Sequence, residues 1–281
     1  MPEGPEVKIM VNNIAMLALG KKLVDAKVIN EGFQKKTKGF EKIPGMLSQN
    51  LRVTEVESKG KLGYMLLSNG HAIVITFGMT GNIRIDPTED FLRKRGETKE
   101  QYMKHCKIEF EVEDDNGERT KFYFHCTRNF AWVYFFTPEE LGKKLSTLGP
   151  SILDQEPLKP NLLLTRWRKF NHKPICVTLM EQKLISGIGN YIKSEVMYHS
   201  EVYPLALTKD LEDETLLRLY EEARKIAKAA YMQGGASLYT YTGLHGDKSD
   251  FKFTLHVYNK SQDLQGNKVE RLQTPDKRTT H

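Results

Sequence analysis

The N-terminus carries the first residues whose types could do chemistry together. The chain begins MPEGPE. A small second residue allows removal of the initiator methionine, which would expose a secondary amine on Pro2. An α-amino group titrates near ~7.7–8.0, so a useful fraction of it is an unprotonated nucleophile at neutral pH. The segment could therefore supply an amine nucleophile.

Attack of such an amine on a sugar C1′ would give an iminium ion. This ion has no N–H proton to lose, so it stays cationic. It therefore acts as an electron sink for the elimination reactions that cleave a strand. Glu3 is a candidate acid that protonates the ring oxygen, and Glu6 could hold the opened sugar. The plainer alternative is an ordinary helix start, where prolines and acids are favoured by geometry and dipole. Taken alone, the motif favours that alternative.

A second group of residues lies in SGIGNYI, residues 186–192. Glycines let the backbone approach a ligand closely, and free N–H groups at a helix start bind phosphate. Asn190 can add a side-chain donor. A helix before this tight turn would complete a helix–two-turn–helix that grips a DNA backbone. A plain glycine-rich helix connection is the alternative.

The third group lies in the strand-rich first half. Lys61 follows a glycine and precedes an apolar run, which suits a phosphate contact, although a solvated lysine is equally common. Three further residues are expected near strand ends: Met79 in FGMTG, and Arg128 and Phe130 in TRNFAW. Such side chains could wedge into a duplex and replace an extruded base. Met79 and Phe130 taken singly are more often core residues, whereas Arg128 is harder to explain as core.

Composition and charge narrow the class of protein. The chain has 281 residues, 39% of them hydrophobic, so two domains are expected. A net charge of +6 suits nucleic acid first and a membrane surface second, although a merely basic enzyme is also compatible. No run has the length of a membrane-spanning helix, and the start lacks a signal-peptide pattern. We expect a soluble, intracellular protein.

The three cysteines are far apart, odd in number and without a C-x-x-C pair: Cys106, Cys126 and Cys176. They predict neither a disulfide framework nor a thiolate zinc site. On this basis no metal and no cofactor is expected.

Periodicity predicts the elements of the first half. Apolar residues at 7, 10, 14 and 17 share a helical face that Gly20 would end. Asn69-Gly70 and Asn116-Gly117 predict hairpins in which both central residues have positive φ. Alternation at 108–112 and 122–124 predicts half-buried antiparallel sheet. Thr137-Pro-Glu-Glu is typical of a capped helix start.

The second half is predominantly helical in pattern. Helices are predicted over 162–170, 175–184, 189–199 and about 213–232, the last ending at Gly234-Gly235. The sequence after residue 241 is polar and has a strand-like pattern. We therefore predict an α+β protein with a β-sandwich domain (1–148), a linker (149–160), a helix–two-turn–helix domain (161–245) and a terminal hairpin-like piece (246–281).

These motifs, in this order, resemble the formamidopyrimidine-DNA glycosylase/endonuclease VIII (Fpg/Nei) family. PEGPE is similar to the Nei-type start, GKLGYMLL to the basic strand, FGMTG to the wedge strand and STLGPSIL to the end of the first domain. The block PICVTLMEQKLISGIGNYIKSEVMYHSEVYP resembles the helix–two-turn–helix, and GGASL with HVYNK resembles the approach to the finger. The resemblance spans nearly the whole chain. Because all motifs occur in the family's order, it outweighs the non-functional interpretation given above for each motif taken alone.

The resemblance implies a role for each candidate residue. It makes Pro2 the nucleophile and Glu3 the general acid. The residues implied to contact sugar and phosphates are Glu6, Lys61 and Asn190. The residues implied to fill the space of the flipped base are Met79, Arg128 and Phe130. The implied partner is damaged DNA, either duplex or single-stranded, bound by a monomer away from any membrane.

The chain departs from most of the family at its C-terminus. No cysteine follows Cys176, so the four-cysteine zinc finger is replaced by a segment that resembles a zincless finger. That likeness makes Arg278 the finger arginine that holds phosphates beside the lesion, and it puts Lys260 near the damaged base. The Nei-type start favours oxidised pyrimidines and hydantoins, released with β,δ-elimination, over 8-oxoguanine.

Other classes remain open at this point. A non-catalytic DNA or RNA binder on the same scaffold would not need an N-terminal amine. A hydrolase that uses paired carboxylates and water would form no covalent intermediate. Trapping of such an intermediate on damaged DNA separates these classes from an amine-dependent lyase.

Overall fold

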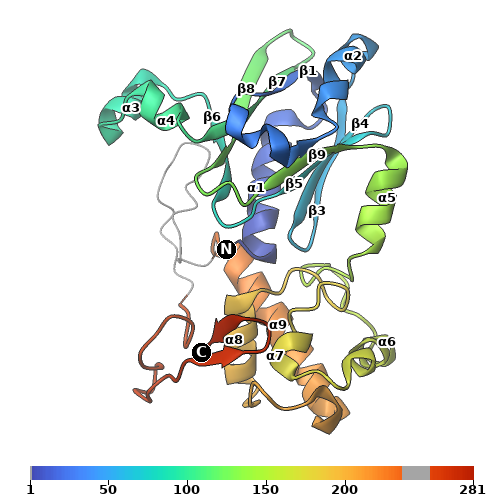
Figure 1. The fold of residues 1–281 in the computed structure, drawn as a ribbon, viewed down its shortest axis with the longest axis vertical. Helices are drawn as coiled ribbons and strands as arrows, with labels where there is room; N and C mark the ends of the chain where they lie inside the picture. The colour runs from blue at the N-terminus through green and yellow to red at the C-terminus, as the bar shows by residue number, and fades with distance from the viewer. Residues whose placement is uncertain (1, 236–253) are drawn as a thin grey trace. The chain divides into compact units, whose positions relative to one another are not determined.

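The chain divides into two compact units in the computed structural model, which describes residues 2–235 and 254–281 (Figure 1). Unit 1 contains residues 2 and 7–145, and unit 2 contains residues 3–6, 146–235 and 254–281. The first helix, α1 (Gly4–Ala18), therefore starts in unit 2 and continues in unit 1. The predicted boundary at 245/246 lies outside the described residues.

Unit 1 contains two mainly antiparallel sheets with a shared hydrophobic core. Ile108, Phe110 and Val112 are fully buried and alternate with half-buried residues, so the predicted alternation is confirmed there. Opposite them, Tyr123 is buried as well as Phe122 and Phe124, so the prediction of a half-buried strand is wrong at 122–124, where both faces are covered. The four-stranded sheet has the order β1 (Lys22–Val28), β7 (Cys106–Glu113), β8 (Arg119–Cys126) and β6 (Gly81–Ile85). The five-stranded sheet has the order β2 (Thr37–Lys38), β9 (Trp132–Phe136), β5 (Ala72–Thr76), β4 (Leu62–Leu67) and β3 (Val53–Lys59).

Both predicted hairpins form, but their turns differ from the expected type. Gly70 and Gly117 have φ of 83° and 81°, whereas neither preceding asparagine has positive φ. The connections are longer than two residues, and side chains close them: Asn69 Oδ1 accepts from the N–H of His71. The same role falls to Asp114 Oδ1, which accepts from the N–H groups of residues 116 and 118.

Short helices complete unit 1, and one of them begins with a reciprocal cap. α5 (Pro138–Ser146) has the predicted reciprocal cap, in which Thr137 Oγ1 accepts from Glu140 N and Glu140 Oε2 accepts from Thr137 N. Apolar residues of α1 at 7, 10, 11, 14 and 18 are buried in the core, and Gly20 follows with φ of 78°. The remaining helices are α2 (Ile43–Met46), α3 (Glu89–Arg95) and α4 (Lys99–Met103).

Unit 2 is helical and has its own core, which includes the fully buried Trp167. Its helices are α6 (Pro160–Trp167), α7 (Ile175–Thr178), α8 (Asn190–His199) and α9 (Asp213–Met232). The prediction for 213–232 is confirmed in both bounds. The prediction for 175–184 is wrong beyond Thr178, because turns follow there and the Gln182 side chain bonds backbone groups of the loop.

The C-terminal segment forms less strand than its pattern suggests. Residues 254–258 are not a strand, since the N–H groups of residues 256–258 donate to the Glu195 carboxylate instead of to a neighbouring strand. A short antiparallel hairpin follows, made of β10 (Leu272–Thr274) and β11 (Arg278–Thr280). Ile152, in the predicted linker, is fully buried in the core of unit 2.

Candidate active site

A small cavity in unit 1 brings together three of the residues singled out in the sequence. Pro2, Lys61 and Phe130 line it, in a volume of about 240 Å³. Lys61 lies in the turn between β3 and β4, and Phe130 lies in the loop between β8 and β9. The remaining lining residues are Val7, Thr76, Phe77 and Gly78. A candidate nucleophile, a lysine and an aromatic side chain therefore share one hollow.

Two loops beside this cavity carry the residues proposed to replace a flipped base. The loop with Met79 follows β5, and the loop with Arg128 and Phe130 follows β8, so the expectation of strand ends is confirmed. Arg128 N donates to Thr80 Oγ1 at 3.1 Å, which joins the loops. A Cβ on Gly78 would lie 2.6 Å from the backbone carbon of Phe130, so the close approach requires glycine.

These candidate side chains differ in exposure. Arg128 is exposed, and Phe130 is 60% exposed even though it is a large aromatic residue. Met79 is half-buried, so it is neither a core residue nor fully exposed. Phe130 is therefore not a core residue, and it is available for contact with a ligand.

In unit 2, the buried side chain of Glu3 is hydrogen-bonded to backbone amides. Its carboxylate accepts N–H bonds from Gly189 at 2.6 Å, Tyr191 at 2.8 Å and Ile192 at 3.3 Å. These amides begin α8, where the helix dipole also favours a negative charge. A Cβ on Gly189 would lie 2.2 Å from Glu3 Cδ, so glycine is needed there. The amides expected to hold an external phosphate thus hold this carboxylate.

Glu6 connects the same helix start to the backbone around Glu3. Its Oε2 accepts from the N–H of Glu3 at 2.8 Å, and its Oε1 accepts from the Tyr191 hydroxyl at 3.1 Å. Glu6 is 3% exposed. The peptide bond that joins Pro2 to Glu3 is therefore fixed through a buried carboxylate. Sequence reasoning missed Tyr191, because its partner lies far away in the chain.

Asn190 and Lys193 attach the C-terminal hairpin to α8. Asn190 Nδ2 donates to the carbonyl of Thr279 at 2.8 Å. Lys193 Nζ pairs with Asp276 Oδ2 at 2.8 Å, and their side chains are 0% and 9% exposed. Arg278 follows Asp276 by two residues and is half-buried. A buried ion pair thus holds the turn of the hairpin, and no local sequence pattern predicts it.

Hydrogen bonds inside the hairpin support that ion pair. Thr274 Oγ1 donates to Asp276 Oδ1 at 2.5 Å. Burial alone would raise the pKa of the Asp276 carboxyl, but its bonds from Lys193 and Thr274 outweigh burial and hold that pKa below its ordinary value. Asp276 is therefore a charged anchor at neutral pH.

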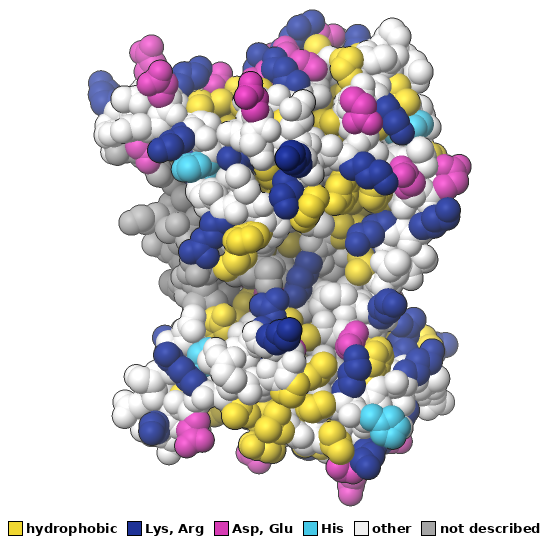
Figure 2. Space-filling view, in the orientation of Figure 1, with side chains coloured by type: hydrophobic (Ala, Val, Ile, Leu, Met, Phe, Trp, Pro, Cys, Tyr) yellow, Lys and Arg dark blue, Asp and Glu magenta, His cyan; other side chains and the backbone are white. Residues whose placement is uncertain are grey.

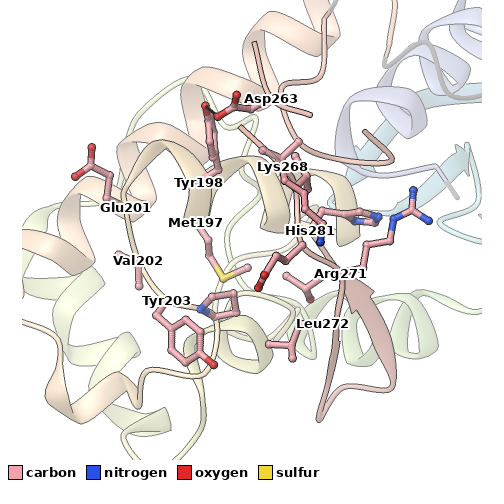
Figure 3. A pocket seen from close by; sticks show the side chains of 15 residues that line it. Met197, Tyr198, Glu201, Val202, Tyr203, Asp263, Lys268, Arg271, Leu272 and His281 are labelled. Carbon is pink, nitrogen blue, oxygen red and sulfur yellow. Dashed lines mark hydrogen bonds between the residues drawn. The ribbon is translucent and has the colours of Figure 1, made fainter. Parts of the chain in front are cut away.

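Lys260 and a larger cavity of unit 2 lie apart from these groups. Lys260 is exposed in the loop after His256, and its N–H donates to the Val257 carbonyl. The cavity, of about 510 Å³, lies between the end of α8 and the hairpin segment, and side chains such as Met197, Tyr203 and Leu272 point into it (Figure 3). None of the sequence-predicted site residues lines it.

The three cysteines do not form a four-thiolate zinc site. All three are buried free thiols, with Cys106 and Cys126 in unit 1 and Cys176 in unit 2. Burial raises the pKa of the Cys106 thiol to about 11, which keeps it protonated. No step of the chemistry is therefore assigned to a cysteine-bound metal.

One face of the molecule carries many cationic side chains as well as some acidic ones (Figure 2). Figure 2 shows Lys and Arg side chains spread over the visible face, with hydrophobic side chains exposed between them. Among the described residues, no helix is long and apolar enough to cross a membrane.

The candidate residues thus fall into two groups. Pro2, Lys61 and Phe130 share the cavity of unit 1, with the Met79 and Arg128 loops beside it. Those in unit 2 are Glu3, Glu6, Asn190 and Arg278 around the start of α8 and the hairpin, with Lys260 elsewhere.

Comparison with known proteins adds the family. The model of the formamidopyrimidine-DNA glycosylase N-terminal domain matches residues 1–133, and that of the formamidopyrimidine-DNA glycosylase H2TH domain matches residues 148–242. A formamidopyrimidine-DNA glycosylase of Bacillus cereus is 28% identical over 262 residues, covering 92% of this chain and 88% of the relative. One of Shewanella denitrificans is 28% identical, with 92% and 89% covered.

Solved structures agree in fold. The wild-type Lactococcus lactis Fpg (MutM) in complex with DNA containing N7-benzyl-Fapy-dG has a TM-score of 0.80 at 20% identity, covering 100% of this chain and 97% of that one. A complex of the same enzyme with DNA containing an abasic site has a TM-score of 0.80, with 99% and 97% covered. Because the two family models together match most of the sequence, this chain belongs to the formamidopyrimidine-DNA glycosylase family of base-excision-repair enzymes, which are DNA glycosylases with AP lyase activity.

Proposed function

We propose that the protein excises oxidised bases from DNA through a covalent intermediate on the amine of Pro2 and then cleaves the strand by β,δ-elimination. The single observation that carries this proposal is the cavity of unit 1, where Pro2 lies with Lys61 and Phe130. A nucleophile, a cation for phosphate and an exposed aromatic for the vacated base position are the parts that such a reaction needs.

The proposed first step forms the Pro2 nitrogen–C1′ bond and breaks the C1′–base bond, and the base leaves with the bonding electrons. The attached nitrogen is then an ammonium. Loss of its proton and opening of the sugar at O4′ give the iminium. That iminium accepts the electrons released when protons are removed at C2′ and then C4′, and each elimination expels a phosphate.

Glu3 is the proposed carrier of the proton between nitrogen and O4′. It follows Pro2 in the chain, and three N–H donors favour its ionised form. An ionised carboxylate can take the ammonium proton and return it to the ring oxygen, so the residue serves as an acid without being protonated at rest. Glu6 is proposed to fix the neighbouring peptide bond and to contact the opened sugar.

The remaining candidates are proposed to hold the strained DNA. Lys61 and Asn190 would contact phosphates near the lesion, and Met79, Arg128 and Phe130 would fill the space of the flipped base. Arg278 would bridge phosphates flanking it through paired, charge-assisted hydrogen bonds. Lys260 is proposed as a contact to the damaged base.

We further propose a Nei-like branch with a zincless finger and a preference for oxidised pyrimidines and hydantoins. Support comes from the absence of any cysteine after Cys176 and from the hairpin that the Lys193–Asp276 pair holds. A preference for 8-oxoguanine or formamidopyrimidines is the second candidate, because the relatives are named formamidopyrimidine-DNA glycosylase and one solved relative binds N7-benzyl-Fapy-dG DNA.

Borohydride trapping tests the proposal. Protein that begins at Pro2 is incubated with duplexes containing 5-hydroxyuracil, a hydantoin, 8-oxoguanine or a preformed abasic site. We expect covalent adducts, with pyrimidine and hydantoin duplexes consumed fastest. Faster trapping on 8-oxoguanine would select the second candidate, and no adduct on any substrate would refute covalent chemistry.

Glu3→Gln refines the test. Excision should collapse, while cleavage at the abasic site should fall less, because that sugar already opens spontaneously. Equal loss on both substrates would mean that Glu3 positions Pro2 instead of carrying a proton.

A further inference from the structure

A cluster of metal-ligating side chains in unit 2 takes no part in the proposed chemistry. Glu195 and His199 lie four residues apart on α8, and His256 comes from the segment that precedes the hairpin. One ligand atom from each residue lies within 4.8 Å of the other two. Side chains at i and i+4 share one helix face, so the first pair is arranged by the helix itself.

The Glu195 carboxylate has room for one more partner. Its Oε1 accepts from the N–H groups of Val257 and Tyr258, and its Oε2 accepts from that of His256. A carboxylate offers about four lone-pair positions. These three bonds therefore leave about one position, on Oε2, and His199 Nε2 lies 3.9 Å from that atom.

The two histidine rings are close but are not stacked face to face. Their centroids are 4.6 Å apart with an interplanar angle of 62°. His199 is exposed and His256 is half-buried, whereas Glu195 is 1% exposed, so an ion could enter from solvent onto a rigid carboxylate.

The distances suit a small divalent ion after modest closure. Zinc binds imidazole nitrogen and carboxylate oxygen at about 2.0–2.2 Å in tetrahedral sites, which puts ligand atoms about 3.3 Å apart. The present separations of up to 4.8 Å require side-chain movements of roughly 1.5 Å in total, which rotation of the two histidine side chains supplies without moving Glu195.

We propose that Glu195, His199 and His256 bind one Zn²⁺, or a similar borderline divalent transition ion, with water as the fourth ligand. Two imidazoles and one carboxylate are a donor set that zinc accepts. The ion joins α8 to the segment leading to the hairpin, so its role is structural. It does not depend on the proposed reaction. The expectation of no metal rested on cysteine spacing, and these donors become neighbours only on folding.

Metal titration tests the site directly. The full chain, prepared without a histidine tag and treated with chelator, is titrated with Zn²⁺ by calorimetry and then melted with and without the ion. Co²⁺ is used as a spectroscopic probe of coordination geometry. We expect one equivalent bound, a higher Tm and the visible absorption of tetrahedral Co²⁺.

His199→Gln and His256→Gln are the test variants, because replacing Glu195 would also break three backbone hydrogen bonds. Each should weaken Zn²⁺ binding at least about tenfold, a loss that even changes outside the ligand set can cause. His172→Gln, at an exposed histidine of unit 2, is the matched control and should bind as wild type does. No binding by folded wild type, or binding unchanged in both test variants, would overturn the proposal.

Discussion

The two units contribute to the candidate site in opposite ways. Unit 1 offers side chains on loops, such as the exposed Phe130 and Arg128, above a core that does not include them. Unit 2 offers buried polar groups, such as Glu3 and Lys193, that are bonded into the interior. We therefore expect the loop residues of unit 1 to affect activity without affecting the stability of the fold, and the buried polar residues of unit 2 to affect both.

The physical reason is the cost of leaving a buried polar group without a partner. An exposed loop side chain can be removed and water replaces its contacts. A charge that is 0% exposed, such as Lys193, leaves its partner uncompensated when it is removed. Substitutions in the loops of unit 1 should therefore change activity alone, and those in the network of unit 2 should change both properties.

The largest effect is expected at Pro2. Any residue retained or added before it acylates the amine, so trapping and strand cleavage should fall by on the order of a thousandfold or more, the scale of losing a nucleophile. DNA binding and Tm should not change. Intact mass would establish the start of each preparation, and a C-terminal extension is the control. Full activity with Met1 attached would contradict the amine mechanism.

Lys193→Met should have the largest effect on stability. It leaves Asp276 buried without its cation, which costs about 3–5 kcal/mol of the free energy of unfolding. The double variant Lys193→Met/Asp276→Leu should regain most of this loss. Urea unfolding can be followed in unit 2 by the fluorescence of Trp167, with Trp132 of unit 1 replaced by phenylalanine, since these are the two tryptophans of the chain.

The exposed pair Lys225–Glu222 on α9 is the control for that measurement. Lys225→Met should change the free energy of unfolding by less than about 1 kcal/mol, as surface ion pairs do. If Lys193→Met behaved like this control, the coupling of site and stability in unit 2 would be refuted.

Arg278→Ala should affect activity without affecting stability, although it lies in unit 2. The Lys193–Asp276 pair, not Arg278, holds the hairpin. Charge-assisted hydrogen bonds of about 1.5–3 kcal/mol would be lost only in the flipped complex, so single-turnover excision should fall roughly ten- to a hundredfold. Arg271→Ala, at an exposed neighbour, is the control. Unchanged excision by a folded Arg278 variant would mean that the phosphate contact lies elsewhere.

The sequence predicted the elements better than it predicted the contacts between them. Alternation located β7 and β8, and the apolar period located α9 in both bounds, because these signals are local. The helix expected over 175–184 failed because Gln182 and the positive φ of Gly187 build a turn there. Hydrogen bonds from a side chain to the backbone of a loop produce no periodic pattern of apolar residues, so the sequence could not predict this turn.

The candidate site shows the same limit. Pro2, Lys61 and Phe130 were recognisable by type and meet in one cavity. The amides at the start of α8 were predicted to be donors for an anion, but their partner in this structure is Glu3, which lies 186 residues from Gly189. Pairings of this kind, and the burial of Lys193 against Asp276, arise from tertiary packing, which no local pattern encodes.

A smaller effect is expected for Phe130→Ala in unit 1. The side chain is 60% exposed, so Tm should stay constant. Loss of about 1 kcal/mol of base stacking should slow excision from duplex DNA about fivefold. Excision from a single strand should change less, because no partner strand has to be kept apart. Tyr203→Ala, at an exposed aromatic of unit 2, is the control, and a large loss of Tm in Phe130→Ala would contradict the separation proposed for unit 1.

The smallest effect concerns His125, a buried polar residue of β8 in unit 1. Burial, with the positive charges of Arg84, His105 and Lys107 nearby, lowers the pKa of His125 to about 3 from its ordinary 6.5. The unfolded chain therefore binds a proton between these two values and the folded chain does not. The resulting stability is fully present above pH 6.5 and falls as the pH drops toward 3.

Between pH 7 and 5.5 this linkage should remove about 1 kcal/mol from the free energy of unfolding. His125→Gln has no proton to bind, so its stability should fall less over the same interval. Urea unfolding of both proteins at the two pH values measures the difference, and groups shared by both, such as His105, cancel in it. If wild type and variant lost the same free energy of unfolding between pH 7 and 5.5, the acid sensitivity of the protein would come from a group other than His125. The proposed coupling of this buried residue of unit 1 to stability would then be wrong.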